Sequence, residues 1–166
     1  MFVKKTANKK KDILWCLFHK ALPLGYRLQH ISPSISGSCP WCDNELQTAE
    51  HFALKCKVSK EIWKQAYGLL KTNQTETPPI SMDEIFTATN IINHNSKQAT
   101  LWLHTNIIYE IWCTYTSFRW GDSNLASRIL PLLVIKRLHK DVNALYYSLK
   151  NCSQKMKNIY KCIQCP

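Results

Sequence analysis

The hydrophobic positions of this chain recur at helical spacing. Near the start, apolar side chains repeat every three or four residues up to Pro23, which predicts a helix over residues 12–22. The same periodicity predicts further helices over residues 48–54, 60–71, 82–91, 101–118 and 129–149. Strict alternation of apolar and polar residues is nowhere sustained, so the sequence predicts an all-α fold.

Turn-forming residues separate these predicted helices. Residues 24–28 are expected to form a turn, and the Ser/Pro/Gly-rich residues 32–38 a loop. Thr48 and Ser59 are predicted to cap the helices that follow them, and Pro131 fits the first turn of the last helix. We therefore divide the chain into a basic flexible N-terminus (1–11), a cysteine-containing module (12–71), a linker (72–81) and a helical C-terminal region with a basic end (82–166).

Four residues within this module have the spacing of a metal site. The pattern is Cys-x2-Cys-x8-His-x4-Cys, formed by Cys39, Cys42, His51 and Cys56. Three thiolates and one imidazole suit tetrahedral zinc, and a site filled by four protein ligands is structural, with no open position for water. The alternative is that three small buried cysteines lie near an unrelated histidine, but the cysteine spacing favours zinc. The sequence thus predicts a helical domain with a zinc knuckle between its first two long helices.

The residues around this pattern resemble a known family. The run Leu22-Pro23-Leu24-Gly25-Tyr26-Arg27-Leu28, the four ligands and the trailing Trp63 resemble the zinc-binding domain found C-terminal to the reverse transcriptases of non-LTR retrotransposons. The resemblance covers about residues 12–70, and residues 107–120 more loosely resemble the helical region that follows that domain. It implies that the four residues are zinc ligands and that the module contacts template nucleic acid.

The catalytic motifs of such polyproteins are missing from these 166 residues. There is no Tyr-x-Asp-Asp run and no carboxylate set of a ribonuclease H, although phosphoryl transfer needs carboxylates to hold Mg²⁺. We therefore expect a non-catalytic module, either a fragment or a free-standing remnant. An enzyme with an unrecognised site is the least favoured class, because a closed zinc site offers no Lewis-acid position.

Charge suggests where an anionic partner would bind. The formal net charge of +11 is concentrated in residues 1–11, 55–71 and 119–166, which favours single-stranded RNA or DNA as the partner. The candidate phosphate contacts are Lys55, Lys57, Lys60, Lys64 and Lys71. Trp41 is a candidate for stacking on a nucleobase, although packing on the first helix near Trp15 is the preferred interpretation. The competing function is a helical protein-interaction module in which zinc is purely structural, with partners bound by the C-terminal region.

Two further expectations concern the cysteines and the compartment. The apolar stretch Leu101–Cys113 is interrupted by polar residues and no signal segment is evident, so we expect an intracellular protein, nuclear or cytoplasmic, that is not secreted and does not cross a membrane. Its eight cysteines should then be reduced. Cys162 and Cys165 form a second Cys-x2-Cys, and whether they bind metal together with Cys152 or His139 is left open.

Overall fold

The computed structural model describes residues 8–42, 45–69, 78–88, 94–121 and 129–149. In order, the described helices are α1 (Asn8–Phe18), α2 (Gly25–Ile31), the π-helical turn η2 (His51–Lys55), α3 (Lys57–Leu69), α4 (Met82–Thr87), α5 (His94–Trp120) and α6 (Leu130–Leu149). The one extended pairing in this part of the chain is an isolated bridge between Ser38 and Leu46. The all-α prediction is confirmed.

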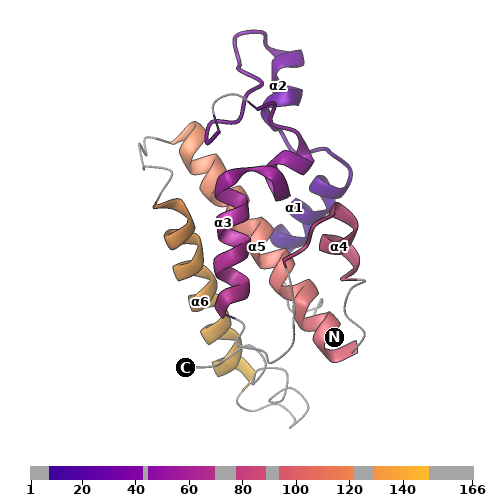
Figure 1. The fold of residues 1–166 in the computed structure, drawn as a ribbon, viewed down its shortest axis with the longest axis vertical. Helices are drawn as coiled ribbons and strands as arrows, with labels where there is room; N and C mark the ends of the chain where they lie inside the picture. Colours follow the sequence, from indigo (N-terminus) through magenta and orange to yellow (C-terminus); the bar gives the residue numbers. More distant parts are fainter. Residues whose placement is uncertain (1–7, 43–44, 70–77, 89–93, 122–128, 150–166) are drawn as a thin grey trace.

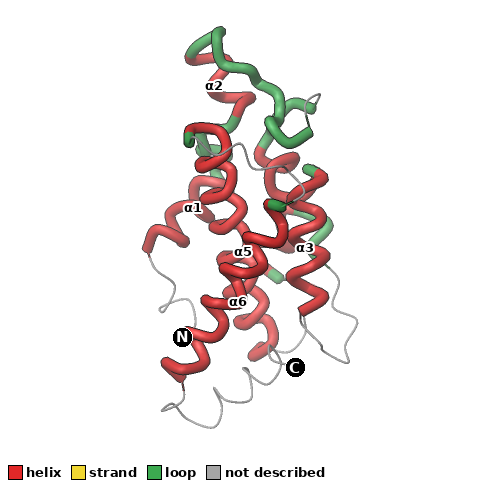
Figure 2. The backbone as a smooth tube through the Cα atoms, turned by 90° about the vertical axis from the view of Figure 1, so that its left-hand side faces the viewer, coloured by secondary structure: helices red, strands yellow, loops and turns green. Residues whose placement is uncertain are grey.

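The long helix α5 organises the molecule. It contacts α1, α3, α4 and α6, and it runs diagonally through the bundle in Figure 1. Ile107, Ile108, Ile111 and Tyr115 on α5 are all fully buried. At the upper end of the same view, α2 and the cysteine-bearing loops project beyond the bundle. In Figure 2 the loops are the green segments above α1 and α3, and α2 is the red helix among them. The cysteine-bearing loops thus lie at one end of α5.

Helix α1 begins and ends about one turn before its predicted bounds. Lys20 adopts a left-handed conformation with φ of 54°, and the Ala21 N–H donates to the Cys16 carbonyl, so the helix is closed before Pro23 is reached. At its start, residues 8–11 are helical, and Lys10 forms an ion pair with Asp141 of α6. Part of the segment that we assigned to a flexible N-terminus therefore belongs to the folded domain.

The prediction of a turn at residues 24–28 is wrong, because α2 occupies this stretch. Gly25 is needed here for close approach: a Cβ atom at this position would lie 2.7 Å from the Gly37 carbonyl oxygen. Its N–H donates to the side-chain oxygen of the fully buried Gln47 at 2.8 Å. A glycine that the sequence presents as a turn signal instead allows two segments to pack tightly.

Ser59 does not cap α3, which begins two residues earlier at Lys57. Its hydroxyl instead donates to the Phe52 carbonyl at 2.7 Å, and the Trp63 indole N–H donates to the Ala53 carbonyl at 2.8 Å. These bonds from α3 give hydrogen-bond partners to two carbonyls of the short η2. The capping prediction for Thr48 holds, because its hydroxyl accepts a hydrogen bond from the His51 N–H at 3.1 Å. Pro131 lies in the first turn of α6, as the sequence predicted.

The buried apolar side chains of α1, η2, α3, α4, α5 and α6 form one hydrophobic cluster. It extends from Leu17 on α1 through Trp63 on α3 and Ile111 on α5 to Leu138 on α6. The proposed linker falls mostly on residues 70–77, which lie outside the described residues, as do Lys71, Cys152, Cys162 and Cys165. Across the described ranges, no helix combines the length and apolar character that crossing a membrane requires.

Candidate metal centre

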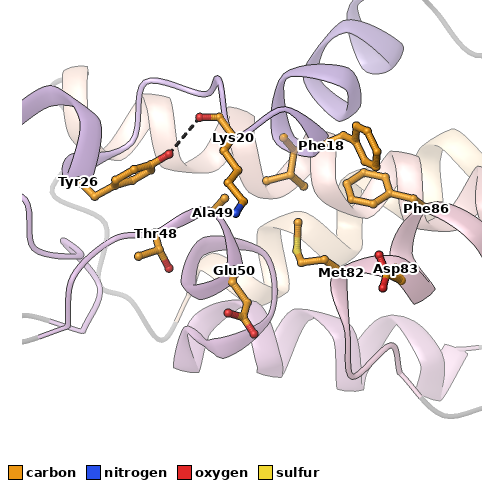
Figure 3. A pocket seen from close by; sticks show the side chains of 10 residues that line it. Phe18, Lys20, Tyr26, Thr48, Ala49, Glu50, Met82, Asp83 and Phe86 are labelled. Carbon is orange, nitrogen blue, oxygen red and sulfur yellow. Dashed lines mark hydrogen bonds between the residues drawn. The ribbon is translucent and has the colours of Figure 1, made fainter.

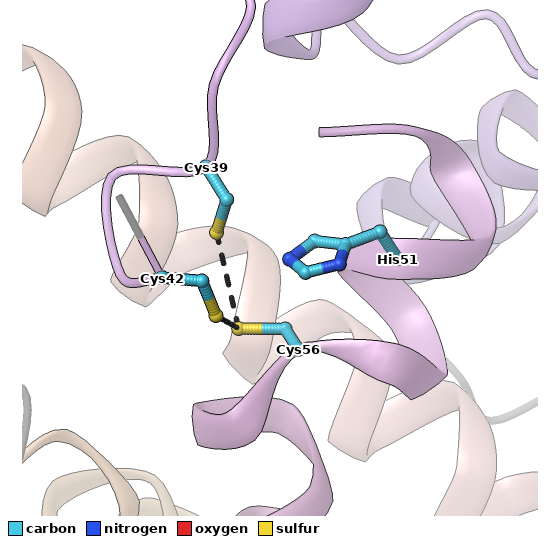
Figure 4. A group of neighbouring side chains, drawn as sticks. All are labelled: Cys39, Cys42, His51 and Cys56. Atoms are coloured by element: carbon cyan, nitrogen blue, oxygen red, sulfur yellow. Dashed lines mark hydrogen bonds between the residues drawn. The ribbon is translucent and has the colours of Figure 1, made fainter. Parts of the chain in front are cut away.

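The first two site residues, Cys39 and Cys42, lie on a tight turn. The Cys42 N–H donates to the Cys39 carbonyl at 3.3 Å, and the Cys39 N–H donates to the Glu45 carbonyl at 2.8 Å. Beside them, Ser38 and Leu46 form the isolated bridge. This chain reversal fixes the turn and places both cysteine side chains toward one side of the loop (Figure 4).

The other two site residues are positioned by η2. His51 is its first residue, and Cys56 follows its last, with the Cys56 N–H donating to the His51 carbonyl at 2.7 Å. The Cys56 carbonyl then accepts from Lys60, so the same residue begins α3. The i-to-i+5 hydrogen bond of this π-helical turn therefore fixes the position of Cys56 relative to His51.

The four side chains converge on one point. One ligand atom from each of Cys39, Cys42, His51 and Cys56 lies within 4.8 Å of the others. The Cys56 sulfur lies 3.4 Å from the Cys42 sulfur and 3.9 Å from that of Cys39. A tetrahedral zinc ion with Zn–S bonds of about 2.3 Å would hold two sulfurs about 3.8 Å apart. The residues that the spacing predicted are thus together at the separation that zinc needs.

The hydrogen bonding of His51 shows which ring nitrogen faces this point. Its Nδ1 lies 2.8 Å from a carboxylate oxygen of Glu45, whereas its buried Nε2 has no hydrogen-bond partner among the residues that the structure describes. In Figure 4 the ring is directed toward the three sulfurs. A buried nitrogen without a partner is costly, and a metal ion on Nε2 would remove that cost. A carboxylate on the other nitrogen is the usual support of a zinc-bound histidine.

The thiol pKa values reflect three sulfurs held close together in a protein interior. A hydrogen bond from Cys56 lowers the pKa of Cys39, and the same contact raises the pKa of Cys56. Burial raises the pKa of Cys42. Without a cation, the negative charges of neighbouring thiolates repel one another, so the three thiols are not all deprotonated together. A bound divalent ion would favour the thiolate form of all three. The donor set and its geometry fit zinc.

Trp41 lies between two of these ligands but is not available to a nucleobase. It is only 2% exposed, and its ring packs edge-on against Tyr115 and near Phe118 of α5. The interpretation that it packs near Trp15 is also wrong, since Trp15 is 65% exposed and lies against His19. The sequence gives no sign of this contact because the partner helix is far away along the chain. Trp41 instead anchors the metal loop to the central helix.

The predicted lysines are exposed where the structure describes them. Lys57, Lys60 and Lys64 occupy one side of α3, and none of them has an ion-pair partner among the described residues. Lys55 differs, because its ammonium group lies 3.2 Å from the Glu50 carboxylate. Three uncompensated positive charges therefore begin immediately after the last ligand.

Sequence reasoning missed two supporting residues. Glu45, which holds His51, was not selected because nothing in its local pattern reveals the chain reversal. Gln47 was also missed: its side-chain oxygen accepts from the Gly25 N–H and from the Tyr115 hydroxyl at 2.9 Å. The signal for both was their position between two ligands, in a loop that must fold back on itself.

Comparison with known proteins identifies the N-terminal part of the chain. Residues 1–63 match the family model described as zinc-binding in reverse transcriptase. The match includes all four candidate ligands and the first half of α3, up to Trp63. No curated protein and no solved structure matches the chain.

Proposed function

We propose that the chain, whose residues 1–63 match the zinc-binding domain of reverse transcriptase, is a non-catalytic, zinc-stabilised module that binds single-stranded nucleic acid. In this proposal it derives from a non-LTR retrotransposon and is a fragment or free-standing remnant of the larger polyprotein. One structural zinc ion is held by Cys39, Cys42, His51 and Cys56. The observation that carries the proposal is the exposed lysine row of α3, which starts directly after the last of these ligands.

The charge distribution supports α3 rather than the metal loop as the phosphate-binding surface. A zinc ion with three thiolates and a neutral imidazole carries one net negative charge, so the loop itself does not attract anions. Helix α3 packs along α6, and the two run side by side in Figure 1. Exposed Lys136 and Lys140 lie one turn apart on α6. Two adjacent helices thus carry exposed lysines that could contact the phosphates of a nucleic-acid strand.

Binding of labelled single-stranded RNA at several salt concentrations tests this function. The zinc-loaded protein should show affinity that falls with salt, with a log–log slope of about −0.7 per phosphate contact. The combined variant Lys57→Gln, Lys60→Gln and Lys64→Gln should reduce the magnitude of the slope by about 2. A flat salt response of the zinc-loaded chain would contradict the proposal.

A matched pair of single variants separates specific contacts from net charge. Lys60→Gln and Lys55→Gln each remove one positive charge, but only the Lys55 charge is offset by a neighbouring carboxylate. Lys60→Gln should therefore change the slope more than Lys55→Gln. Equal effects would indicate that the chain responds to total charge alone. Zinc stoichiometry measured on each variant verifies that the metal site is unchanged.

A further inference from the structure

One face of α1 exposes an aromatic cluster that the metal site does not use. The side chains of Trp15 and Phe18 are 65% and 54% exposed. The exposed imidazole of His19 lies between them, with ring-centroid distances of 4.0 Å to Trp15 and 5.1 Å to Phe18. Most other aromatic residues that the structure describes are buried or half-buried, and a patch of three neighbouring exposed rings is typical of a binding site.

Two of these rings, those of Trp15 and Phe18, border a groove of about 450 Å³ between α1, α4 and α5. Trp15 and Phe18 line it from α1, Phe86 from α4 and Trp102 from α5. Its volume lies in the range of small-molecule sites. Among the described residues of its lining, Lys11 is the only charged one, and none of them carries a carboxylate. The groove therefore combines flat aromatic surface with a single cation.

A second pocket continues from this groove. It has a volume of about 520 Å³ and shares Phe18 and Phe86 with the first. Figure 3 shows the two phenyl rings together at one end and the Lys20 side chain extending into the pocket. Glu50 and Asp83 also line it, but Glu50 is within 3.2 Å of Lys55. A chain-like ligand lying along α1 would thus pass from Lys11 over the aromatic rings toward Lys20.

The charges on α1 favour an anionic ligand. Lys9 is exposed and Lys11 half-buried, whereas Asp12 is the only acidic residue of the helix. Lys10 does not contribute, because it is engaged by Asp141 and Asn106. Aromatic faces on which bases stack, with lysines placed to meet the backbone, are the features by which proteins bind single strands without sequence preference.

We propose that this face of α1 is a base-stacking site for single-stranded nucleic acid, in which a nucleobase stacks on Trp15 beside Phe18 while Lys11 meets the adjacent phosphate. The assignment rests on the proposed nucleic-acid binding and adds a base contact to it. It also replaces the stacking role that the sequence suggested for the buried Trp41. In Figure 2, α1 and α3 lie on either side of α5, so the aromatic site is separate from the lysine row of α3.

The test compares Trp15→Ala with Trp120→Ala, using a labelled single-stranded RNA oligonucleotide and an abasic strand of the same length. Trp120 is the matched control, since it is 60% exposed but lies at the far end of α5, outside both pockets. Trp15→Ala should weaken RNA binding by about 5- to 100-fold without changing the salt slope, because stacking releases no counterions. Trp15→Phe should restore part of the affinity. Trp120→Ala should have no effect.

Two further measurements, binding to the abasic strand and the oligomeric state of the protein, distinguish base stacking from other roles of Trp15. The wild-type protein and Trp15→Ala should bind the abasic strand equally, since it offers no base to stack. Unchanged RNA affinity in Trp15→Ala, while the α3 lysine variants still flatten the salt response, would overturn this site and leave the proposed function intact. Loss of self-association in Trp15→Ala with unchanged RNA affinity would overturn it as well, because the groove would then be an interface between copies. No RNA binding by the wild-type protein would overturn both proposals.

Discussion

At the scale of single residues, the metal ligands could be predicted because their information is local. A turn of the Cys-x-x-Cys type brings two sulfurs together, and the spacing to His51 and Cys56 identified Cys39 and Cys42 as members of a four-ligand set. The role of Glu45 could not be predicted in this way. Its contact with His51 depends on the reversal that pairs Ser38 with Leu46, and no periodicity reports such a reversal.

The substitution Glu45→Gln tests the support of His51. Losing the carboxylate removes the charge that orients the imidazole and increases its basicity, so zinc affinity should fall by about tenfold. The lower end of the usual range is expected because the Glu45 side chain is 63% exposed. Competition with a chromophoric chelator measures the change. Glu50→Gln is the control, since Glu50 pairs with Lys55 and not with a ligand; an equal loss in both variants would contradict the assigned role.

At the scale of helices, the presence of each long element was predicted better than its bounds. Apolar periodicity reveals α3, α5 and α6, because their buried faces repeat along the chain. It does not reveal where they end. Helix α1 stops at the left-handed Lys20, and α3 starts at Lys57 because Cys56 accepts its first hydrogen bond. These ends are set by contacts between segments, which sequence spacing does not contain.

Buried His104 joins three helices and was not given a role by the sequence. Its Nε2 lies 2.6 Å from the Tyr67 hydroxyl of α3, and its Nδ1 lies 3.1 Å from the Ile85 carbonyl of α4. The Trp63 ring is perpendicular to it at 5.2 Å. Burial lowers the pKa of His104 to about 4. The neutral imidazole thus stabilises the junction of α3, α4 and α5.

The depressed pKa of His104 predicts a loss of stability in mild acid. Between pH 6.5 and about 4 the unfolded chain binds a proton that the folded chain does not, so the free energy of unfolding should decrease as the pH falls through this range. The full effect is about 3 kcal/mol, from 1.36 kcal/mol per unit of pKa difference. Urea unfolding of the wild-type protein and of His104→Gln at several pH values measures it. The variant cannot titrate there, and identical pH dependence of the two proteins would contradict the prediction.

At the scale of the whole molecule, the metal loop and the helical bundle are physically continuous. Trp41 and Phe52 pack against Tyr115 of α5, and Gln47 receives the hydroxyl of the same tyrosine. On α5, Arg119 donates to the Ser36 carbonyl at 2.9 Å. The boundary between residues 12–71 and 82–166 remains a prediction, but the buried side chains on its two sides belong to one cluster. Loss of order in the loop should therefore reach α5.

Removal of zinc should consequently destabilise the bundle as well as the loop. Binding of a structural zinc ion supplies on the order of 10 kcal/mol, which is comparable to the total stability of a domain. A chelator should reduce the helical circular dichroism and the hydrogen-exchange protection of α5, and added zinc should restore both. Cys42→Ser should reproduce the effect without a chelator, whereas Cys16→Ser, which changes a half-buried cysteine outside the metal cluster, should behave as the wild-type protein. Persistent protection of α5 in the zinc-free chain would show that the bundle folds independently of its metal loop, although the two share one core.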